Sequence, residues 1–415
     1  MRIVRKLGQF ASPCLRLVVQ GVVCLLITAL AIACTAPLAA TPDGDTAASD
    51  GHGDGQTQEL ALAEAIPGRL VHIDLGEIAL DPLTGSSKPV AFSLPTGTLS
   101  AAITTSGPAT VHLALLRWQS GGGPYLIVPS WLAGPFAPAL CVDGCTFRQA
   151  ERPEQQVALA PNAPLPVNLA GKNEIMVYGY TWSAAAKRLP SGTTVRVTVD
   201  AVLAPPVSKG RLSINICLTG AGGITAALAP NHARIAEAVA VVREIFAAIA
   251  VDIAVAFVDV KAAQFVRHDA DDSEITELFK SGAHAPLGIN VFLVQELNLE
   301  TGGAPAAMSG LSGGIPGPIR QRGSAQAGVV VAIKLQPGQP DRLGVAIAHE
   351  IGHYLGLFHT EEPPSAQGPP LADQLTDTGT GDDGNMMYWS PQAHSKAITA
   401  QQATVIRQSP WIDPD

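Results

Sequence analysis

The residues with the clearest chemical potential form one short segment, His349-Glu350-Ile351-Gly352-His353-Tyr354-Leu355-Gly356-Leu357-Phe358-His359. It places three imidazoles, one carboxylate and one glycine at the spacing H-E-x-x-H-x-x-G-x-x-H. Three imidazole nitrogens are a ligand set that zinc takes in catalytic sites, where the fourth position stays open for water. The spacing therefore predicts one catalytic Zn²⁺ bound by His349, His353 and His359.

The same spacing predicts how the segment is built. Residues four apart lie on one face of a helix, so His349 and His353 should project together from a helix over 341–355. Gly356 takes a left-handed backbone without a Cβ penalty, so it can end this helix and return His359 to the metal. Glu350 is rotated by about 100° from His349. We therefore expect Glu350 to be the general base that moves a proton from water to the leaving amine, while zinc polarises the substrate carbonyl.

With a methionine further along the chain, this motif resembles the metzincin metallopeptidases, which share the extended zinc motif and a methionine turn. The turn corresponds to Asn385-Met386-Met387-Tyr388-Trp389. The pattern Asn-x-Met favours Met387, which we prefer, and the pattern Met-x-Tyr favours Met386. In the second alignment Tyr388 takes the position that some metzincins use to bind zinc or the transition state. The resemblance implies a protein or peptide substrate extended across a cleft.

Other short segments resemble the pappalysin-like branch of this group. They are Thr360 after the third histidine, Leu375-Thr376-Asp377-Thr378 with Gly379 where the branch has proline, and Ile398-Thr399-Ala400-Gln401-Gln402. Some pappalysin-like enzymes carry calcium near the active site. The turn Asp382-Asp383-Gly384-Asn385 would bind Ca²⁺ through its carboxylates, and the alternative is an ordinary acidic turn.

The zinc segment lies in a half of the chain, residues 206–415, where predicted strands and helices alternate. The resemblance implies a metzincin-like domain with a twisted mixed sheet and an active-site helix, within an α+β fold. Residues 302–328 are rich in glycine, and they predict either an edge strand that binds peptide beside the cleft or a surface loop. The predicted strands are Arg211–Leu218, Ala254–Val260, Ile289–Glu296 and Gly328–Lys334, and the predicted helices are Asn231–Ala250 and Ser273–Lys280.

Residues 61–205 have a different pattern, with short alternating strands between turn-forming residues. It predicts an all-β accessory domain, a sandwich or jelly roll, that ends at Ala204-Pro205-Pro206. Cys141 and Cys145 would close a small disulfide loop in an oxidising compartment, whereas Cys217 lies in an apolar run and is expected to be a buried free thiol. The clearest predicted strands are Leu70–Leu75, Thr110–Leu116, Glu174–Gly179 and Thr194–Val202.

The first 34 residues predict a targeting segment, because basic residues precede the apolar stretch Leu17–Ala33. Its end, Leu30-Ala31-Ile32-Ala33-Cys34, resembles a bacterial lipobox, which implies lipidation of Cys34. Residues 35–60 would then be a flexible linker. The alternatives are cleavage near Pro37-Leu38-Ala39-Ala40 or an uncleaved anchor. All three predict export, with a membrane-anchored lipoprotein as our preference and a soluble secreted protein as the alternative.

Composition limits the remaining classes of function. The net charge is −9 and no basic run follows the N-terminus, which argues against nucleic-acid binding. The hydrophobic fraction is 47%, but aromatic residues make up only 5% and much of the apolar excess is alanine. We therefore do not expect a membrane-embedded protein, and we expect membrane contact only through the lipid anchor. We predict an exported zinc endopeptidase. The alternative is a lipoprotein binding module whose hydrolase half is latent or acts on a non-peptide amide. The sequence specifies neither the peptide cut nor the oligomeric state.

Overall fold

The computed structural model describes residues 63–66 and 69–415, except 124, 129–145, 147, 151, 163–166, 182–187, 261–266, 270–271, 302–303, 335–340 and 364–370. The predicted targeting segment with Cys34, the linker, and the cysteine pair Cys141 and Cys145 therefore lie outside the described residues. Residues Glu59–Asp415 belong to one compact unit. Within the described ranges, no helix has the length and apolar character needed to cross a membrane.

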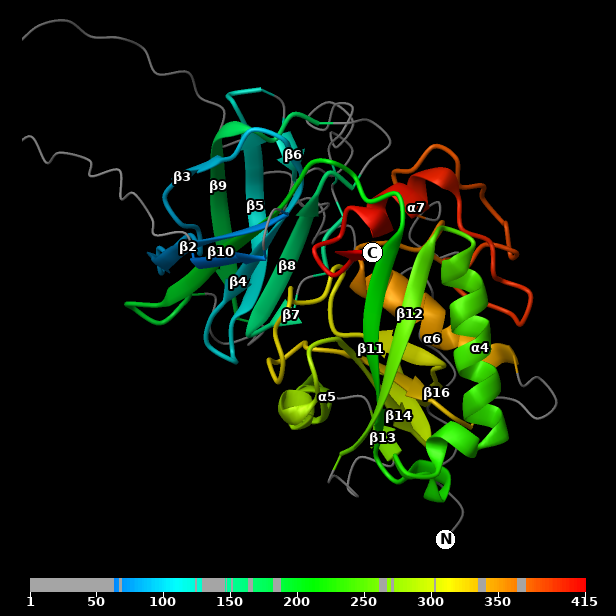
Figure 1. Ribbon diagram of the computed structural model, residues 1–415. Helices are drawn as coiled ribbons and strands as arrows, with labels where there is room; N and C mark the ends of the chain where they lie inside the picture. The colour runs from blue at the N-terminus through cyan, green and yellow to red at the C-terminus, as the bar shows by residue number, and fades with distance from the viewer. Residues whose placement is uncertain are drawn as a thin grey trace, which may run out of the picture. The chain divides into compact units, whose positions relative to one another are not determined.

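The described residues of the N-terminal region, within 63–203, form two antiparallel sheets (Figure 1). The two sheets share one hydrophobic core. The sheet orders are β1-β2-β10-β4-β8 and β3-β9-β5-β6, with β7 paired to β5. Alternate side chains of β9 are buried, as expected for a strand with one face on a core. The strands are β1 Ala63–Ile66, β2 Leu70–Ala79, β3 Val90–Leu94, β4 Thr98–Ser106, β5 His112–Ser120, β6 Tyr125–Ile127, β7 Arg152–Pro153, β8 Gln155–Ala160, β9 Gly171–Tyr180 and β10 Thr194–Leu203.

The C-terminal region, residues 210–415, is built on a mixed sheet with the order β12-β11-β14-β18-β17. Neighbouring strands are parallel from β12 to β18, whereas β17 runs antiparallel to β18 at one end. Every side chain of β14 and β18 is buried, as is typical of parallel strands covered on both faces. The strands are β11 Gly210–Leu218, β12 Val251–Asp259, β14 Ile289–Val294, β17 Gly310–Ser312 and β18 Val329–Ala332; β19 Asp413–Pro414 pairs with β11, and β13 Arg267–Asp269, β15 Glu296–Thr301 and β16 Ala304–Ala307 form a small second sheet.

Two helices of this region position the histidine segment. Helix α6 packs against β17, β18 and helix α4. The two helices lie so close at Gly344 of α6 that a Cβ added there would be 2.6 Å from Cβ of Val241 in α4. Glycine at this position therefore permits the close packing. The α-helices are α4 Ala233–Ala247, α5 Asp272–Ser281, α6 Asp341–Tyr354 and α7 Ala400–Arg407; short 3₁₀ turns are η2 Ala221–Gly223, η3 Ala229–Asn231 and η5 Gly282–His284. Mixed sheets with few helices confirm the predicted α+β class.

The two regions share a hydrophobic cluster. Ala102 of β4 and Val157 and Leu159 of β8 belong to the same buried cluster as residues of α4, α6 and α7. Arg69, just before β2, adds polar contacts by donating to the carbonyl oxygens of Ile412 at 2.6 Å and Arg407 at 3.0 Å. The N-terminal region is therefore packed onto the C-terminal region. The predicted domain boundary between residues 205 and 206 stays a prediction.

Most predicted elements are present, with differences at their ends. The predicted helix over 341–355 ends at Tyr354, and the helix predicted over 231–250 covers only Ala233–Ala247. That second helix is followed at Ala250 by a residue with φ of 57°, which is outside the helical range. The surface-loop interpretation of 302–328 is wrong for part of this stretch, since it contains β16 and β17 and residues 312–314 and 316–319 are buried. Residues 320–324 are intermediate or exposed and belong to no helix or strand.

Candidate metal centre

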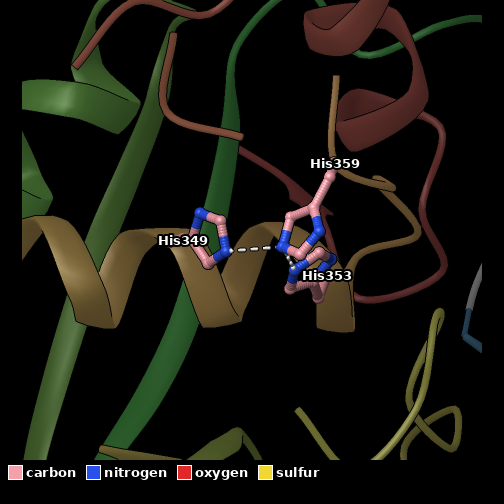
Figure 2. A group of neighbouring side chains, drawn as sticks. All are labelled: His349, His353 and His359. Atoms are coloured by element: carbon pink, nitrogen blue, oxygen red, sulfur yellow. Dashed lines mark hydrogen bonds between the residues drawn. The ribbon is translucent and has the colours of Figure 1, made fainter. Parts of the chain in front are cut away.

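Three imidazoles meet at one point, as Figure 2 shows. His349 and His353 stand on one face of α6, and His359 returns to them from the segment after the helix. The Nε2 atom of His359 lies 3.2 Å from Nε2 of His349 and 3.1 Å from Nε2 of His353. Two nitrogens bound to one tetrahedral zinc at about 2.0–2.1 Å lie roughly 3.3 Å apart. The donor set and its spacing therefore fit zinc. Among the described residues, this is the one group of three or more His, Cys, Asp or Glu side chains close enough to hold a metal.

Each imidazole is held through its other ring nitrogen, Nδ1. Carbonyl and carboxylate oxygens only accept hydrogen bonds, so each Nδ1 carries the proton and each Nε2 keeps its lone pair for a metal. The contacts of Nδ1 are His349 to the carbonyl oxygen of Met386 at 2.7 Å, His353 to the carbonyl oxygen of Leu357 at 2.7 Å, and His359 to Oε2 of Glu362 at 2.9 Å.

Burial keeps two of these imidazoles neutral. Loss of water lowers the pKa of His349 to about 3, with a further contribution from His359. Burial also moves the pKa of His353 well below its ordinary value, and the neighbouring histidines add to this effect. Neutral imidazole is the form that binds a metal. The site is thus prepared for a cation rather than for an anion.

The turn at Gly356 brings the third imidazole back. Its φ of 112° lies in the range that favours glycine. The turn is closed by backbone hydrogen bonds from Gly356 N to His353 O and from Leu357 N to Gly352 O, both 2.9 Å. A Cβ at Gly356 would also lie 2.7 Å from Cδ2 of Leu159 in the N-terminal region. The helix-ending role expected of this glycine is therefore confirmed.

Glu350 points its carboxylate into the cavity beside the imidazoles. Its residue exposure is only 6%, and burial raises the pKa of the carboxyl group to about 8. Packing holds it in place, since a Cβ on Gly310 of β17 would lie 2.7 Å from both Cγ and Oε1 of Glu350. Within the described part of the chain, no hydrogen bond engages this carboxylate. The carboxylate of Glu350 therefore lies beside the three imidazoles, where a proton acceptor could reach a metal-bound water.

The cavity has a volume of about 450 Å³ and is bounded by β17, α6 and the segment after the two methionines. Tyr388, the predicted transition-state stabiliser, is not among the described residues that line it, whereas the adjacent Trp389 is. Sequence reasoning also missed Arg152 of the N-terminal region and Arg342 of α6, which carry no motif. The lining is Arg152, Met308, Ser309, Gly310, Leu311, Ser312, Ile315, Arg342, Ala346, His349, Glu350, His353, His359, Glu362, Trp389, Ser390 and Pro391.

Both candidate methionines pack against α6 between its two histidines. A Cβ on Gly352 would lie 2.5 Å from Sδ of Met387 and 2.8 Å from Cε of Met386. Both methionines are fully buried. Met387 thus presents its sulfur to the helix, and the carbonyl oxygen of Met386 accepts the hydrogen bond from His349. The preference for Met387 as the residue of the methionine turn stays a prediction.

The other predicted residues are placed as follows. Asp382 and Asp383 are exposed; Asp382 Oδ1 accepts from the backbone N–H of Gly384 at 3.1 Å, and Asp383 pairs with His394 at 3.3 Å. These contacts describe an ordinary acidic turn, and nothing in the described residues supports calcium. Cys217 is a buried free thiol as predicted, and burial raises its pKa to about 12.

Comparison with known proteins gives distant likenesses. No protein-family model and no curated protein matches the chain. Among solved structures, archaemetzincin from Methanopyrus kandleri is 17% identical with a TM-score of 0.27, covering 50% of this chain and 91% of that one. Metalloproteinase-II from Bacteroides fragilis is 12% identical with a TM-score of 0.31, covering 51% of this chain and 62% of that one. These TM-scores are too low to establish a shared fold.

Proposed function

We propose that the protein is a zinc-dependent endopeptidase of the metzincin type, in its pappalysin-like branch. The observation that carries the proposal is the convergence of three Nε2 atoms beside a buried carboxylate in one cavity. Three histidine ligands leave a coordination position open, which is the pattern of catalytic rather than structural zinc. The methionine pair against Gly352 supports the metzincin assignment. No observation in the described residues favours a latent hydrolase or a binding module.

The chain's own residues account for proton movement in this proposal. Glu350 takes the proton of the attacking water and delivers it to the nitrogen of the leaving amine. Its burial favours the protonated form of the carboxyl group after transfer. When bound, zinc would supply positive charge that favours ionised Glu350 before transfer, and Lewis acidity that polarises the carbonyl and activates water.

The substrate is proposed to be a polypeptide bound in extended form. Strand β17 pairs with β18 on one side, and within the described residues no strand pairs with its other side. Gly310, Leu311 and Ser312 of β17 line the cavity with Glu350. An extended peptide can add to such an edge through backbone hydrogen bonds, which brings its carbonyl groups past the histidines.

We also propose export as a lipoprotein, with the lipobox-like segment before Cys34 as support. A chain with Cys34→Ala, labelled with a palmitate analogue in bacterial cells, should lose the label. Retention of the label on that variant would assign acylation to another residue and remove this part of the proposal.

The test of the activity uses the full chain with a quenched peptide library and casein. We expect cleavage that requires one zinc ion per chain and is abolished by phenanthroline. Glu350→Gln should lower kcat by at least about a hundredfold while zinc content is retained, because a general base contributes about 10²–10⁴ in rate. Glu277→Gln, an exposed change on α5, is the matched control. Equal cleavage by Glu350→Gln and the parent chain would refute the mechanism.

A further inference from the structure

Arg148 belongs to the N-terminal region, yet its side chain reaches the segment that carries the third histidine. The side chain is only 8% exposed, so its charge has been withdrawn from water. A buried guanidinium is costly unless it is paired. Its hydrogen bonds and its ring contact lie within Phe358–Glu362: Nη1 donates to the carbonyl oxygen of His359 at 3.2 Å, Nη2 pairs with Oε1 of Glu362, and Cζ lies 4.5 Å from the centre of the Phe358 ring. The carboxylate of Asp373 adds a weaker electrostatic attraction to the guanidinium.

Glu362 connects this arginine to the imidazole. One carboxylate oxygen pairs with Arg148, and the other accepts the hydrogen bond from Nδ1 of His359 at 2.9 Å. The imidazoles of His349 and His353 rest on backbone carbonyls of the C-terminal region. Among the described residues, His359 is the one imidazole of the three whose Nδ1 is held by a side chain, and it is also the most exposed of the three, with 22% of its side chain exposed. Its orientation therefore depends on what holds Glu362.

A second contact fixes the start of the same segment. Asn162 is buried, with only 7% of its surface exposed, and its Nδ2 donates to the carbonyl oxygen of Gly356 at 2.6 Å. Leu159 packs against the same glycine. Residues of the N-terminal region thus hold the Gly356–Glu362 segment near its beginning and at its end. The N-terminal region therefore contacts the segment that carries the third imidazole at both ends.

We propose that Arg148 positions the third metal ligand, His359, by holding Glu362. The N-terminal region then contributes directly to the affinity of the site for metal. The proposal rests on the metal-binding role proposed above for the three histidines, but it does not require peptide cleavage. Contacts of this kind orient a ligating imidazole, and their loss typically weakens metal binding by about 10–100-fold.

The experiment measures the zinc dissociation constant of the full chain by competition with a chromophoric chelator. Arg148→Met, which keeps the length of the side chain but removes its charge, should bind zinc about 10–100-fold more weakly than the parent. Arg148→Lys should recover part of the loss, because it restores one charged contact to Glu362. Arg117→Met is the control, since Arg117 forms an ion pair with Glu174 at 2.7 Å within the N-terminal region.

Two further readouts separate positioning from general damage. The visible absorption of the Co²⁺-substituted chain should change in Arg148→Met and stay unchanged in Arg117→Met. The losses from Arg148→Met and Glu362→Gln should not add in the double variant, because the first acts through the second. Unchanged zinc affinity in Arg148→Met, an equal loss in Arg117→Met, or additive losses would each overturn the proposal. A parent chain that binds no zinc would instead refute the proposed metal centre itself.

Discussion

The carboxylate of Glu350 is positioned by packing rather than by hydrogen bonds. Gly310 at the edge of the sheet approaches it closely, and the missing side chain there leaves room for Cγ and Oε1 of the glutamate. A proton acceptor must stay within hydrogen-bond reach of its water, about 2.6–3.2 Å. The absence of a Cβ at Gly310 is therefore a condition for the proposed chemistry.

Gly310→Ala should displace Glu350 and reduce catalysis without removing the metal. The new Cβ would lie 2.7 Å from Cγ and Oε1, so the carboxylate must move. Because a misplacement of about 1 Å can cost about a hundredfold in rate, we expect kcat on a model peptide to fall at least tenfold. Zinc content should stay at the parent value. Gly379→Ala, where the nearest atom is 3.8 Å from the added Cβ, is the control and should behave as the parent chain.

An unchanged kcat in Gly310→Ala would show that the carboxylate is free to shift at no cost, and would contradict this account. Loss of zinc in the same variant would place the effect on the ligands instead.

Local spacing explains which residues of the site could be predicted. Helix geometry alone sets the relative directions of His349, Glu350 and His353, because the four steps from residue 349 to residue 353 span slightly more than one turn. Arg148 could not be predicted, because it is 211 residues from the His359 carbonyl that it contacts. Glu362 is close in sequence, but its role depends on the path of the loop after Gly356, for which the sequence offered no separate signal.

At the scale of elements, helix α7 and the methionine-containing segment form one hydrogen-bonded unit. Thr399 caps α7, and Gln402 completes the capping box by accepting from the N–H of Thr399 at 2.9 Å. The amides of Gln402 and Asn385 also pair with each other through two contacts of 3.1 Å. Asn385 in turn accepts from the N–H of Met387 at 2.8 Å. The cap of α7 therefore supports the segment that packs beneath Gly352.

Two substitutions in α7 should separate these roles. Thr399→Ala removes one cap and should lower the free energy of unfolding by about 1 kcal/mol. Gln402→Leu should cost about 2–3 kcal/mol, because it also leaves the buried amide of Asn385 without its partner. Only Gln402→Leu should weaken zinc binding, since Asn385 orders the backbone whose Met386 carbonyl holds His349. Urea unfolding and zinc competition measure the two effects.

Equal zinc affinity in the two α7 variants would contradict the link between the cap and the metal centre. The segment Ile398–Gln402 contains the capping box with which α7 begins. Its pairing with Asn385 was not foreseen, because two amides of compatible shape in separate segments carry no periodic signal.

At the scale of the whole molecule, the pattern of apolar and polar residues predicted short strands before residue 205. After that residue, it predicted strands that alternate with helices. It did not predict that β4 and β8 would contribute Ala102, Val157 and Leu159 to the core of the C-terminal region. In the sequence, a strand buried on both sides is typically a run of apolar residues, and in β8 this run is Val157–Ala160, preceded by the two buried glutamines Gln155 and Gln156. Such a run does not reveal which element covers its second face.

This shared core leads to a prediction for the separated halves. A chain of residues 206–415 alone keeps all three histidines and Glu350, but it lacks Arg148, Asn162 and Leu159. It should bind zinc more weakly than the Arg148→Met full chain, because the anchor at Gly356 is lost together with the one at Glu362. Adding residues 59–205 as a separate chain should restore affinity in part, since the contacts between the regions are noncovalent.

The control is a full chain cut between residues 204 and 206 after folding, through an inserted protease site. Cutting leaves every contact between the regions in place, so zinc affinity should stay at the parent value. A 206–415 chain that binds zinc as tightly as the cut protein would show that the C-terminal region orders its own metal centre. The contacts of Arg148 and Asn162 would then stabilise only the docking of the two regions, because orientation of His359 would no longer depend on them.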